Sequence, residues 1–235
     1  MKRNLTLAGI LCAGMILSSC SASITTGNNV ANTNKPANTA NNASNSANKS
    51  NTTSNSNSTK TEVKDEKANR PTNTKKQPNA PTVPAEWVYY ADEVRGYGFS
   101  LPKGSESGND STDGIDTFVG ETPEKISIIV WAFKDKTMTK ESLLDFAEKA
   151  LNELGETIKA GELKGESDDY AVADGTSESK DGTKSNLKVL VATDVTDNYV
   201  MIVRSAAADY EKNKATMDMI WGSFEMYSGG ASGNN

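Results

Sequence analysis

The stretch that decides the fold is residues 125–133, which read KISIIVWAF. Successive side chains of a strand point to opposite faces, so this stretch has two sets of side chains. One set contains Ile126, Ile128, Val130 and Ala132, and the other contains Ile129, Trp131 and Phe133. Both sets are apolar, which is typical of a strand that is covered on both faces. The sequence therefore predicts a β-sheet with other layers packed on both sides of it.

A helix is predicted directly after this strand, over residues 139–154. Apolar residues recur there at intervals of three and four, which places them on one helix face. They are Leu143, Phe146, Ala147, Ala150, Leu151 and Leu154. Thr139 is a suitable N-cap residue, and Gly155 stands where a glycine commonly ends a helix.

Further strands are expected on either side of this pair, over residues 87–90, 97–102, 115–119, 169–180, 183–193 and 199–206. Asp181-Gly182 has the composition of a hairpin turn. A second helix is expected over residues 209–221, with an inner face of Tyr210, Met217, Ile220 and Trp221. This order of elements predicts an α+β fold, in which an antiparallel sheet is flanked by helices.

The order of these segments resembles the PsbP-like family. The resemblance covers about residues 87–227 and rests on YGFSLP from residue 97, KISIIVWAF from 125, TKESLLDFAEKALNEL from 139, NYVMIVRSAA from 198 and WGSFEMY from 221. It implies an α/β/α sandwich and a mostly non-catalytic role in binding proteins or ligands. These segments are packing patterns, so the resemblance supplies no active-site residues.

The chain before this domain has a different composition. Residues 21–85 contain no Trp, Tyr or Phe and consist mainly of Asn, Ser, Thr, Ala, Lys and Pro. Such a segment buries too little apolar surface to offset the entropy lost on ordering. We therefore expect a disordered tether over residues 20–85, one globular domain over residues 86–228, and a disordered tail over residues 229–235.

The charge is divided in the same way within a formal net charge of −6. Residues 20–85 contain eight basic and three acidic side chains, whereas residues 86–235 contain 15 basic and 28 acidic ones. An acidic domain repels phosphate backbones, so we expect no nucleic-acid partner.

The N-terminus predicts export. Lys2 and Arg3 precede an apolar stretch, residues 5–17, which is too short to span a membrane and is typical of a secretory signal. The following LSSC, residues 17–20, resembles the bacterial lipobox. This resemblance implies a signal peptide of residues 1–19, cleavage between Ser19 and Cys20, and a lipid on the Cys20 thiol. The alternative is an ordinary cleaved signal with a cysteine at its end by chance.

Such a lipoprotein is expected in the bacterial cell envelope, held in the membrane by the lipid on Cys20. Acyl chains such as palmitate contribute about 0.8 kcal/mol per buried CH₂. Ser21 rather than Asp follows the cysteine, which implies the outer membrane in a cell with two membranes and the outer leaflet of the cell membrane otherwise. Cys12 lies inside the signal, so no disulfide is expected in the mature chain.

The chain contains no histidine. This excludes Ser-His-Asp and Cys-His catalysis and metal sites that use imidazole. Acylation of Cys20 would also remove its thiolate as a nucleophile or ligand. We therefore expect no catalytic residue, no metal and no cofactor.

Several patterns match only fragments of known sites. Residues 177–180, SESK, have the S-x-x-K spacing of penicillin-recognising serine enzymes, but the S-D-N and K-T-G partners are missing. Residues 46–49 repeat this spacing inside the expected tether. Residues 109–114 begin like a calcium loop, but the twelfth position is Gly120 rather than Glu, so we expect a polar surface loop.

Three tryptophans and one pair of aspartates are the remaining candidates for ligand contacts. We expect Trp131 and Trp221 to pack in the core, whereas Trp87 at the domain edge is open to either role. Asp168 and Asp169 are adjacent, and adjacent strand residues face opposite ways.

The sequence therefore predicts a lipid-anchored, non-catalytic module that binds an unknown envelope protein or small ligand. A carboxylate-dependent hydrolase of envelope glycan is the alternative, favoured only by the abundance of Asp and Glu. A purely structural spacer would differ from the first prediction only in lacking a partner.

Overall fold

The computed structural model describes residues 60–134, 138–165, 167–195 and 197–227. The predicted signal peptide, the predicted lipidation site Cys20, the predicted tether up to residue 59 and the predicted tail at 229–235 lie outside these residues. Within the described ranges, no helix is long and apolar enough to cross a membrane.

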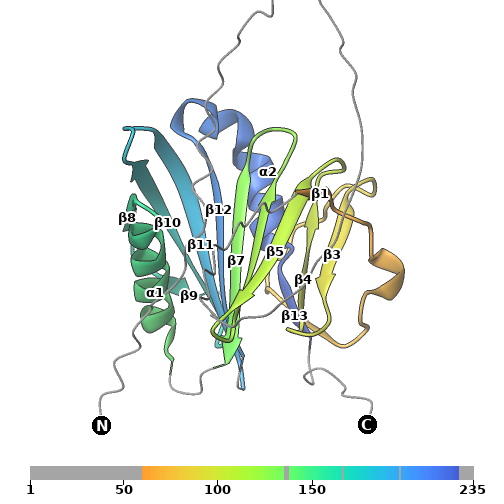
Figure 1. Ribbon diagram of the computed structural model, residues 1–235. Helices are drawn as coiled ribbons and strands as arrows, with labels where there is room; N and C mark the ends of the chain where they lie inside the picture. Colours follow the sequence, from red (N-terminus) through yellow and green to blue (C-terminus); the bar gives the residue numbers. More distant parts are fainter. Residues whose placement is uncertain (1–59, 135–137, 166, 196, 228–235) are drawn as a thin grey trace, which may run out of the picture. The chain divides into compact units, whose positions relative to one another are not determined.

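A large antiparallel sheet forms the centre of the fold (Figure 1). Its strands follow the order β1-β5-β6-β7-β12-β11-β10-β8, and β9 also pairs with β10. Their bounds are β1 Thr61–Glu62, β5 Glu106–Thr112, β6 Ile115–Glu121, β7 Ser127–Lys134, β8 Glu156–Ala160, β9 Lys164–Gly165, β10 Tyr170–Ser179, β11 Lys184–Asp194 and β12 Asp197–Ala206. The predicted antiparallel sheet is confirmed.

A second, smaller sheet was not predicted. Its order is β2-β13-β4-β3, with β2 Thr74–Lys76, β13 Glu225–Tyr227, β4 Tyr97–Leu101 and β3 Val88–Asp92. β3 and β4 are consecutive in the sequence, but β13 lies far from both β2 and β4, so the pairing that completes this sheet has no local signature. Figure 1 shows this sheet on the side of the large sheet opposite to helix α1, Lys140–Glu153.

Strand β7 lies inside the large sheet, and its two faces belong to two different cores. Ile128 and Val130 pack with side chains of the small sheet and of helix α2, Tyr210–Gly222. Ile129 and Trp131 pack with α1. The prediction that this strand is covered on both faces is therefore confirmed.

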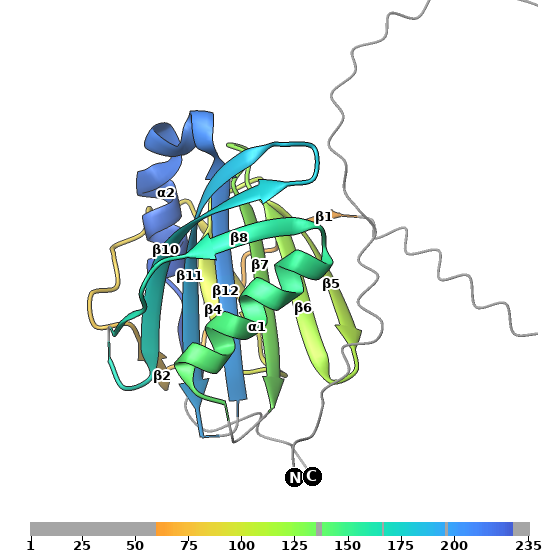
Figure 2. The ribbon, with the colours of Figure 1, turned by 90° about the vertical axis from the view of Figure 1, so that its left-hand side faces the viewer.

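Helix α1 lies across one face of the large sheet (Figure 2). Leu143, Ala147, Ala150 and Leu151 are buried on its inner face. The Oγ1 of Thr139 accepts a hydrogen bond from the backbone N–H of Ser142 at 3.2 Å, and Gly155 has a φ of 88° beyond the last turn. The predicted N-cap and terminating glycine are both confirmed.

Replacement of the N-cap tests this part of the fold. Thr139→Ala is expected to lower the free energy of unfolding by about 1 kcal/mol, because it leaves an N–H group of the first turn unpaired. Urea titration followed by circular dichroism measures the effect. Thr139→Ser keeps the hydroxyl and is the matched control, so equal losses in the two variants would contradict the role of the cap.

The helix-flanked sandwich is present only in part. Met217 and Ile220 of α2 cover the face of the large sheet opposite to α1, as the second helix was expected to do. The small sheet covers part of the same face, with Tyr97, Phe99 and Met226 in the core. One outer layer therefore combines a helix and a sheet, because α2 alone is too narrow to cover this face. Two 3₁₀ turns, η1 Lys67–Asn69 and η2 Ala207–Asp209, complete the described elements.

The domain begins earlier than predicted. Residues 60–85, which we call the strap, contribute β1 to the large sheet and β2 to the small one. Val63 is buried in the core, and Gln77 Nε2 donates to the carbonyl oxygen of Trp221 at 2.6 Å. The boundary predicted at residue 86 is therefore wrong. The strap lacks aromatic residues because it is held by backbone pairing and polar side chains.

The polar loop predicted at residues 109–114 is also wrong for most of its length. Asn109 to Thr112 belong to β5, and Asp113-Gly114 is the tight turn to β6, with φ of 53° and 80°. Strand β5 is polar because most of its residues are exposed or half-buried.

Candidate functional site

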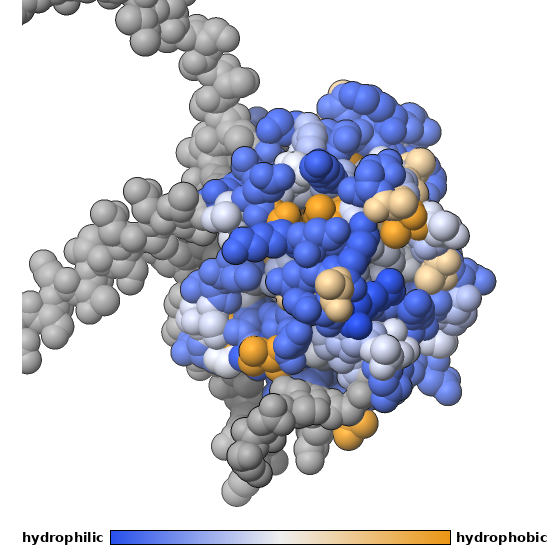
Figure 3. Space-filling view, turned by 90° about the vertical axis from the view of Figure 1, so that its right-hand side faces the viewer, coloured by the Kyte–Doolittle hydropathy of each residue, from blue (hydrophilic) through white to orange (hydrophobic). Residues whose placement is uncertain are grey.

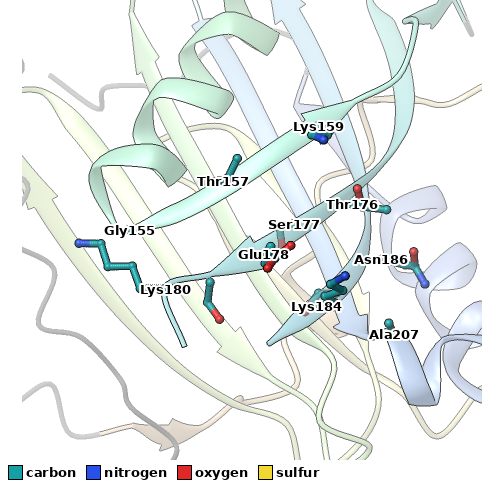
Figure 4. Close-up of a pocket in the computed structure, with 12 residues that line it drawn as sticks. Gly155, Thr157, Lys159, Thr176, Ser177, Glu178, Lys180, Lys184, Asn186 and Ala207 are labelled. Atoms are coloured by element: carbon teal, nitrogen blue, oxygen red, sulfur yellow. The ribbon is translucent and has the colours of Figure 1, made fainter. Parts of the chain in front are cut away.

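An open pocket of about 590 Å³ lies over β8, β10 and β11 (Figure 4). Its lining residues are almost all polar and include Thr157, Lys159, Thr176, Glu178, Lys184 and Asn186. Ala207, just before α2, forms a further part of its wall. Among the described residues, this pocket is the candidate functional site.

Strand register brings these side chains together. Lys159 of β8 stands opposite Thr176 of β10, which stands opposite Asn186 of β11. In the next row, Thr157 stands opposite Glu178, which stands opposite Lys184. Directly opposed residues of an antiparallel sheet point to the same face, so both rows face the pocket side.

The pocket exists because β10 and β11 extend past the part of the sheet that α2 covers. Lys188 of β11 marks the limit of this cover. Its Nζ lies 2.7 Å from Asp174 Oδ1, 3.5 Å from Asp218 Oδ1 of α2, and 5.3 Å from the centre of the Trp221 ring. Beyond Lys188, the same strand face is open to solvent at Asn186 and Lys184.

Lysine is the main charged residue of the pocket. Lys159, Lys180 and Lys184 line it together with one carboxylate, Glu178. Among the described residues, none of the three ammonium groups has an ion pair or a side-chain hydrogen bond. Lys180 differs from the other two because its chain lies against Gly155, as Figure 4 shows.

The S-x-x-K pattern falls in this region without forming a nucleophilic site. Ser177 is 5% exposed in the middle of β10, and Lys180 lies in the hairpin turn after it. Penicillin-recognising chemistry needs the serine at the start of a helix, which this position does not provide. The pattern is a chance match within a strand and its turn.

The three tryptophans do not line the pocket. Trp131 is buried against Phe146 of α1, with ring centres 5.7 Å apart, and Trp87 is buried in the other core. The role of Trp87, which the sequence left open, is therefore packing. Trp221 is only partly buried, and its Nε1 donates to Asp218 Oδ1 at 3.1 Å.

Carboxylates do not form the pair that a glycan hydrolase needs in this pocket, since Glu178 is alone there. A second depression, of about 400 Å³, contains Asp92, Asp110 and Asp116. Asp116 forms an ion pair with Arg95, whose backbone N–H donates to Asp92 Oδ1 at 2.9 Å. The Oδ2 of Asp110 accepts from the Thr112 hydroxyl at 3.3 Å. All three carboxylates thus have structural partners.

The adjacent aspartates at 168 and 169, considered above as a possible carboxylate pair, are likewise at the surface. The Nζ of Lys75, in the strap, lies 3.6 Å from Asp169 Oδ2 and 2.9 Å from Asp194 Oδ1. Within the described ranges, no group of three or more acidic, cysteine or histidine side chains is arranged to hold a metal ion.

A buried charged cluster fastens the strap to the domain. Glu225 of β13 is 1% exposed, and it accepts hydrogen bonds from Arg70 Nε at 2.6 Å and Nη2 at 2.5 Å. The Tyr89 hydroxyl donates to the same carboxylate at 2.5 Å, and the Arg70 guanidinium lies over the Tyr89 ring. These hydrogen bonds with Glu225 raise the pKa of Arg70 above its usual value. The carboxylate is fully engaged, so the cluster is structural.

The face that carries the strap and the small sheet offers no comparable site. Figure 3 shows this face as mainly hydrophilic, with hydrophobic residues scattered singly. Among the described residues, the large hydrophobic side chains that are strongly exposed are Val94 and Val195. Scattered residues of this kind are normal for a protein surface.

Sequence reasoning did not identify the pocket residues. One signal was present in β11, where Lys184, Asn186 and Lys188 alternate with the apolar residues Leu187 and Val189. This alternation indicates a strand with one buried face and one solvent-exposed face. It does not show that β8 supplies Lys159 beside that face.

Comparison with known proteins identifies the fold. No protein-family model and no curated protein matches the chain. The solution structure of cyanobacterial PsbP (CyanoP) from Synechocystis sp. PCC 6803 is similar, with a TM-score of 0.50 and 16% identity over 62% of this chain and 95% of that one. A Bacteroides thetaiotaomicron crystal structure is more distant, with a TM-score of 0.38 and 11% identity over 60% of this chain and 48% of that one. The described domain therefore has a PsbP-like fold.

Proposed function

We propose that this protein is a lipid-anchored lipoprotein of the bacterial cell envelope, whose PsbP-like domain binds a partner without catalysing a reaction. The lipid is attached to Cys20 after cleavage behind Ser19. The domain, which begins with the strap, follows a tether that extends to residue 59. The partner is a protein or ligand of the envelope.

The N-terminal sequence supports the anchoring part of this proposal. Residues 17–20, LSSC, follow a basic start and an apolar stretch of signal length. Two or three acyl chains on one cysteine hold a protein firmly in a membrane, whereas one chain holds it only marginally. The membrane is the outer one in a cell with two membranes, and otherwise the anchor lies in the outer leaflet of the cell membrane.

The pocket over β8, β10 and β11 is the observation that carries the binding part. It contains cationic and hydrogen-bonding side chains that have no partners within the described domain. It lacks a carboxylate pair, and the chain has no histidine to act as a base. Such a surface has the groups to hold a ligand, and it contains neither the carboxylate pair of a glycan hydrolase nor an imidazole to activate a serine.

Fractionation of cells tests the anchor. Cys20→Ala is expected to move the protein from the membrane fraction to the soluble or secreted fraction, because the acyl chains can no longer be attached. Cys12→Ala is the matched control, since it removes the other cysteine and leaves the LSSC sequence intact. Retention of the Cys20→Ala protein in the membrane would refute the anchor. Mass spectrometry of the mature N-terminus should show an acylated Cys20.

A further inference from the structure

We propose that the pocket over β8, β10 and β11 binds an anionic envelope polymer whose sugar or polyol units carry carboxylate or phosphate groups. This inference rests on the proposed function, because the location in the envelope determines which polymers the domain meets. It adds the chemical class of the ligand, which the fold does not supply.

The first argument is that the acidic neighbours of the pocket are already engaged, apart from Glu178 in its lining. Glu156 at the start of β8 forms an ion pair with Arg204 of β12. Asp174 pairs with Lys188 at 2.7 Å. Asp181 accepts hydrogen bonds from Ser179 and Thr183 in the hairpin turn, and these bonds lower its pKa. Glu178 stands opposite Lys184 and is the one carboxylate of the lining, so the three lysines leave a positive excess for an external anion.

The second argument concerns the contrast with the rest of the domain. Residues 86–235 contain 28 acidic and 15 basic side chains, yet this pocket is lined by three lysines and one glutamate. A local positive site on an acidic surface attracts anions to one place, and the surrounding negative charge disfavours binding elsewhere. The charge pattern thus selects both the sign and the location of the ligand.

The third argument is the spacing of the two lysines that face the open pocket. Lys159 and Lys184 are separated by β10, and their rows are offset by two residues along the strands. Strand spacings of about 4.8 Å and rises of about 3.3 Å per residue place their Cα atoms about 11–12 Å apart. Two lysine side chains that start from Cα atoms this far apart can each reach a separate anionic group, which favours a polymer with repeated charges over one small anion.

The uncharged lining residues fit the same ligand. Thr157, Thr176 and Asn186 present hydroxyl and amide groups without side-chain partners in the described domain, and Figure 4 shows them on the three neighbouring strands around the lysines. No aromatic and no arginine side chain lines the pocket, so it has no surface on which bases or neutral sugar rings stack. Recognition is by charge and hydrogen bonds.

Titration calorimetry of the full chain in a neutral detergent tests the inference. The probes are sodium alginate, which carries carboxylates, poly(glycerol phosphate), which carries phosphates, neutral dextran and inorganic phosphate. We expect at least one anionic polymer to bind and the binding to weaken with added salt. The two anionic polymers identify which charged group is preferred. The proposal would be overturned if dextran bound as tightly as the anionic polymers. It would also be overturned if inorganic phosphate bound as tightly, per anionic group, as the polymers do.

Variants locate the binding. Lys159→Gln combined with Lys184→Gln is expected to weaken binding about tenfold. The control pair Lys103→Gln and Lys149→Gln removes the same charge from two exposed lysines that lie outside the pocket and have no ion pairs in the described domain, and it should change the affinity less than twofold. Lys159→Arg combined with Lys184→Arg should retain most of the affinity. Equal losses in the Gln pairs would overturn the pocket as the site.

The outcome is separable from that of the anchoring experiment. Calorimetry in detergent measures polymer binding whether or not the chain is acylated, and circular dichroism verifies that each variant is folded. Absence of binding to both anionic polymers overturns the ligand class but leaves the anchor in place. Recovery of the wild-type protein in the soluble fraction instead of the membrane fraction overturns the anchor, but it does not affect the polymer site.

Discussion

A chain that begins at residue 86 is expected to be largely unfolded, whereas a chain that begins at residue 60 keeps the stability of the domain. The shorter chain loses the strap, and with it Val63 in the core and Arg70 beside Glu225. Loss of one buried aliphatic side chain, and of the partly exposed cation that pairs with the buried Glu225 carboxylate, costs about 5 kcal/mol. This is comparable to the entire stability of a typical domain, about 5–15 kcal/mol.

The strap also protects strand edges. Without β2, strand β13 presents an unpaired edge, which favours association between chains. The shorter chain should therefore show both loss of cooperative urea unfolding and aggregation in size-exclusion chromatography. A chain that begins at residue 60 is the control. Equal urea midpoints for the two chains would show that the strap does not belong to the folded unit.

Arg70→Ala is expected to lower the free energy of unfolding by about 3 kcal/mol, the largest effect of a single substitution that we predict. The reason is that it leaves the Glu225 carboxylate buried without its cation. The hydroxyl groups of Tyr89 and Thr74 still donate to Glu225, so two of the four hydrogen bonds remain. Urea titration of the full chain measures the loss.

Two controls separate the ion pair from other effects of this substitution. Lys64→Ala removes one positive charge from an exposed strap residue that has no ion pair, and it should cost less than about 0.5 kcal/mol. The double variant Arg70→Met and Glu225→Met removes both charges, and it should be more stable than Arg70→Ala alone. A double variant that is less stable than either single variant would contradict the argument.

Local sequence patterns were sufficient for the elements that bury apolar side chains. The two apolar faces of β7, the spacing in α1 and the Asp181-Gly182 turn were all read from neighbouring residues. Strands β1, β2, β5, β8, β9 and β13 were not predicted, because they are short or polar and derive their stability from partners elsewhere in the chain. Thr74, for example, lies in a segment whose composition predicts disorder, yet it stands opposite Tyr227 in the small sheet.

Local sequence patterns could not predict the candidate site, for a related reason. Lys159, Thr176 and Asn186 are adjacent only because of the register among β8, β10 and β11. The alternation of polar and apolar residues in β11 indicates a solvent-exposed face, but it does not show where α2 stops covering that face. The absence of histidine, in contrast, needed no structure, and it limits the chemistry of any site in the chain.

The pairing of the strap with the last strand has a consequence for how the chain matures. Residues 70 and 225 are separated by 155 positions, so contacts of very high sequence separation close the small sheet. During synthesis, the strap leaves the ribosome long before β13 exists to receive it. The polypeptide therefore stays incompletely folded until β13 has emerged, which is the state that the proposed export through a narrow channel would require.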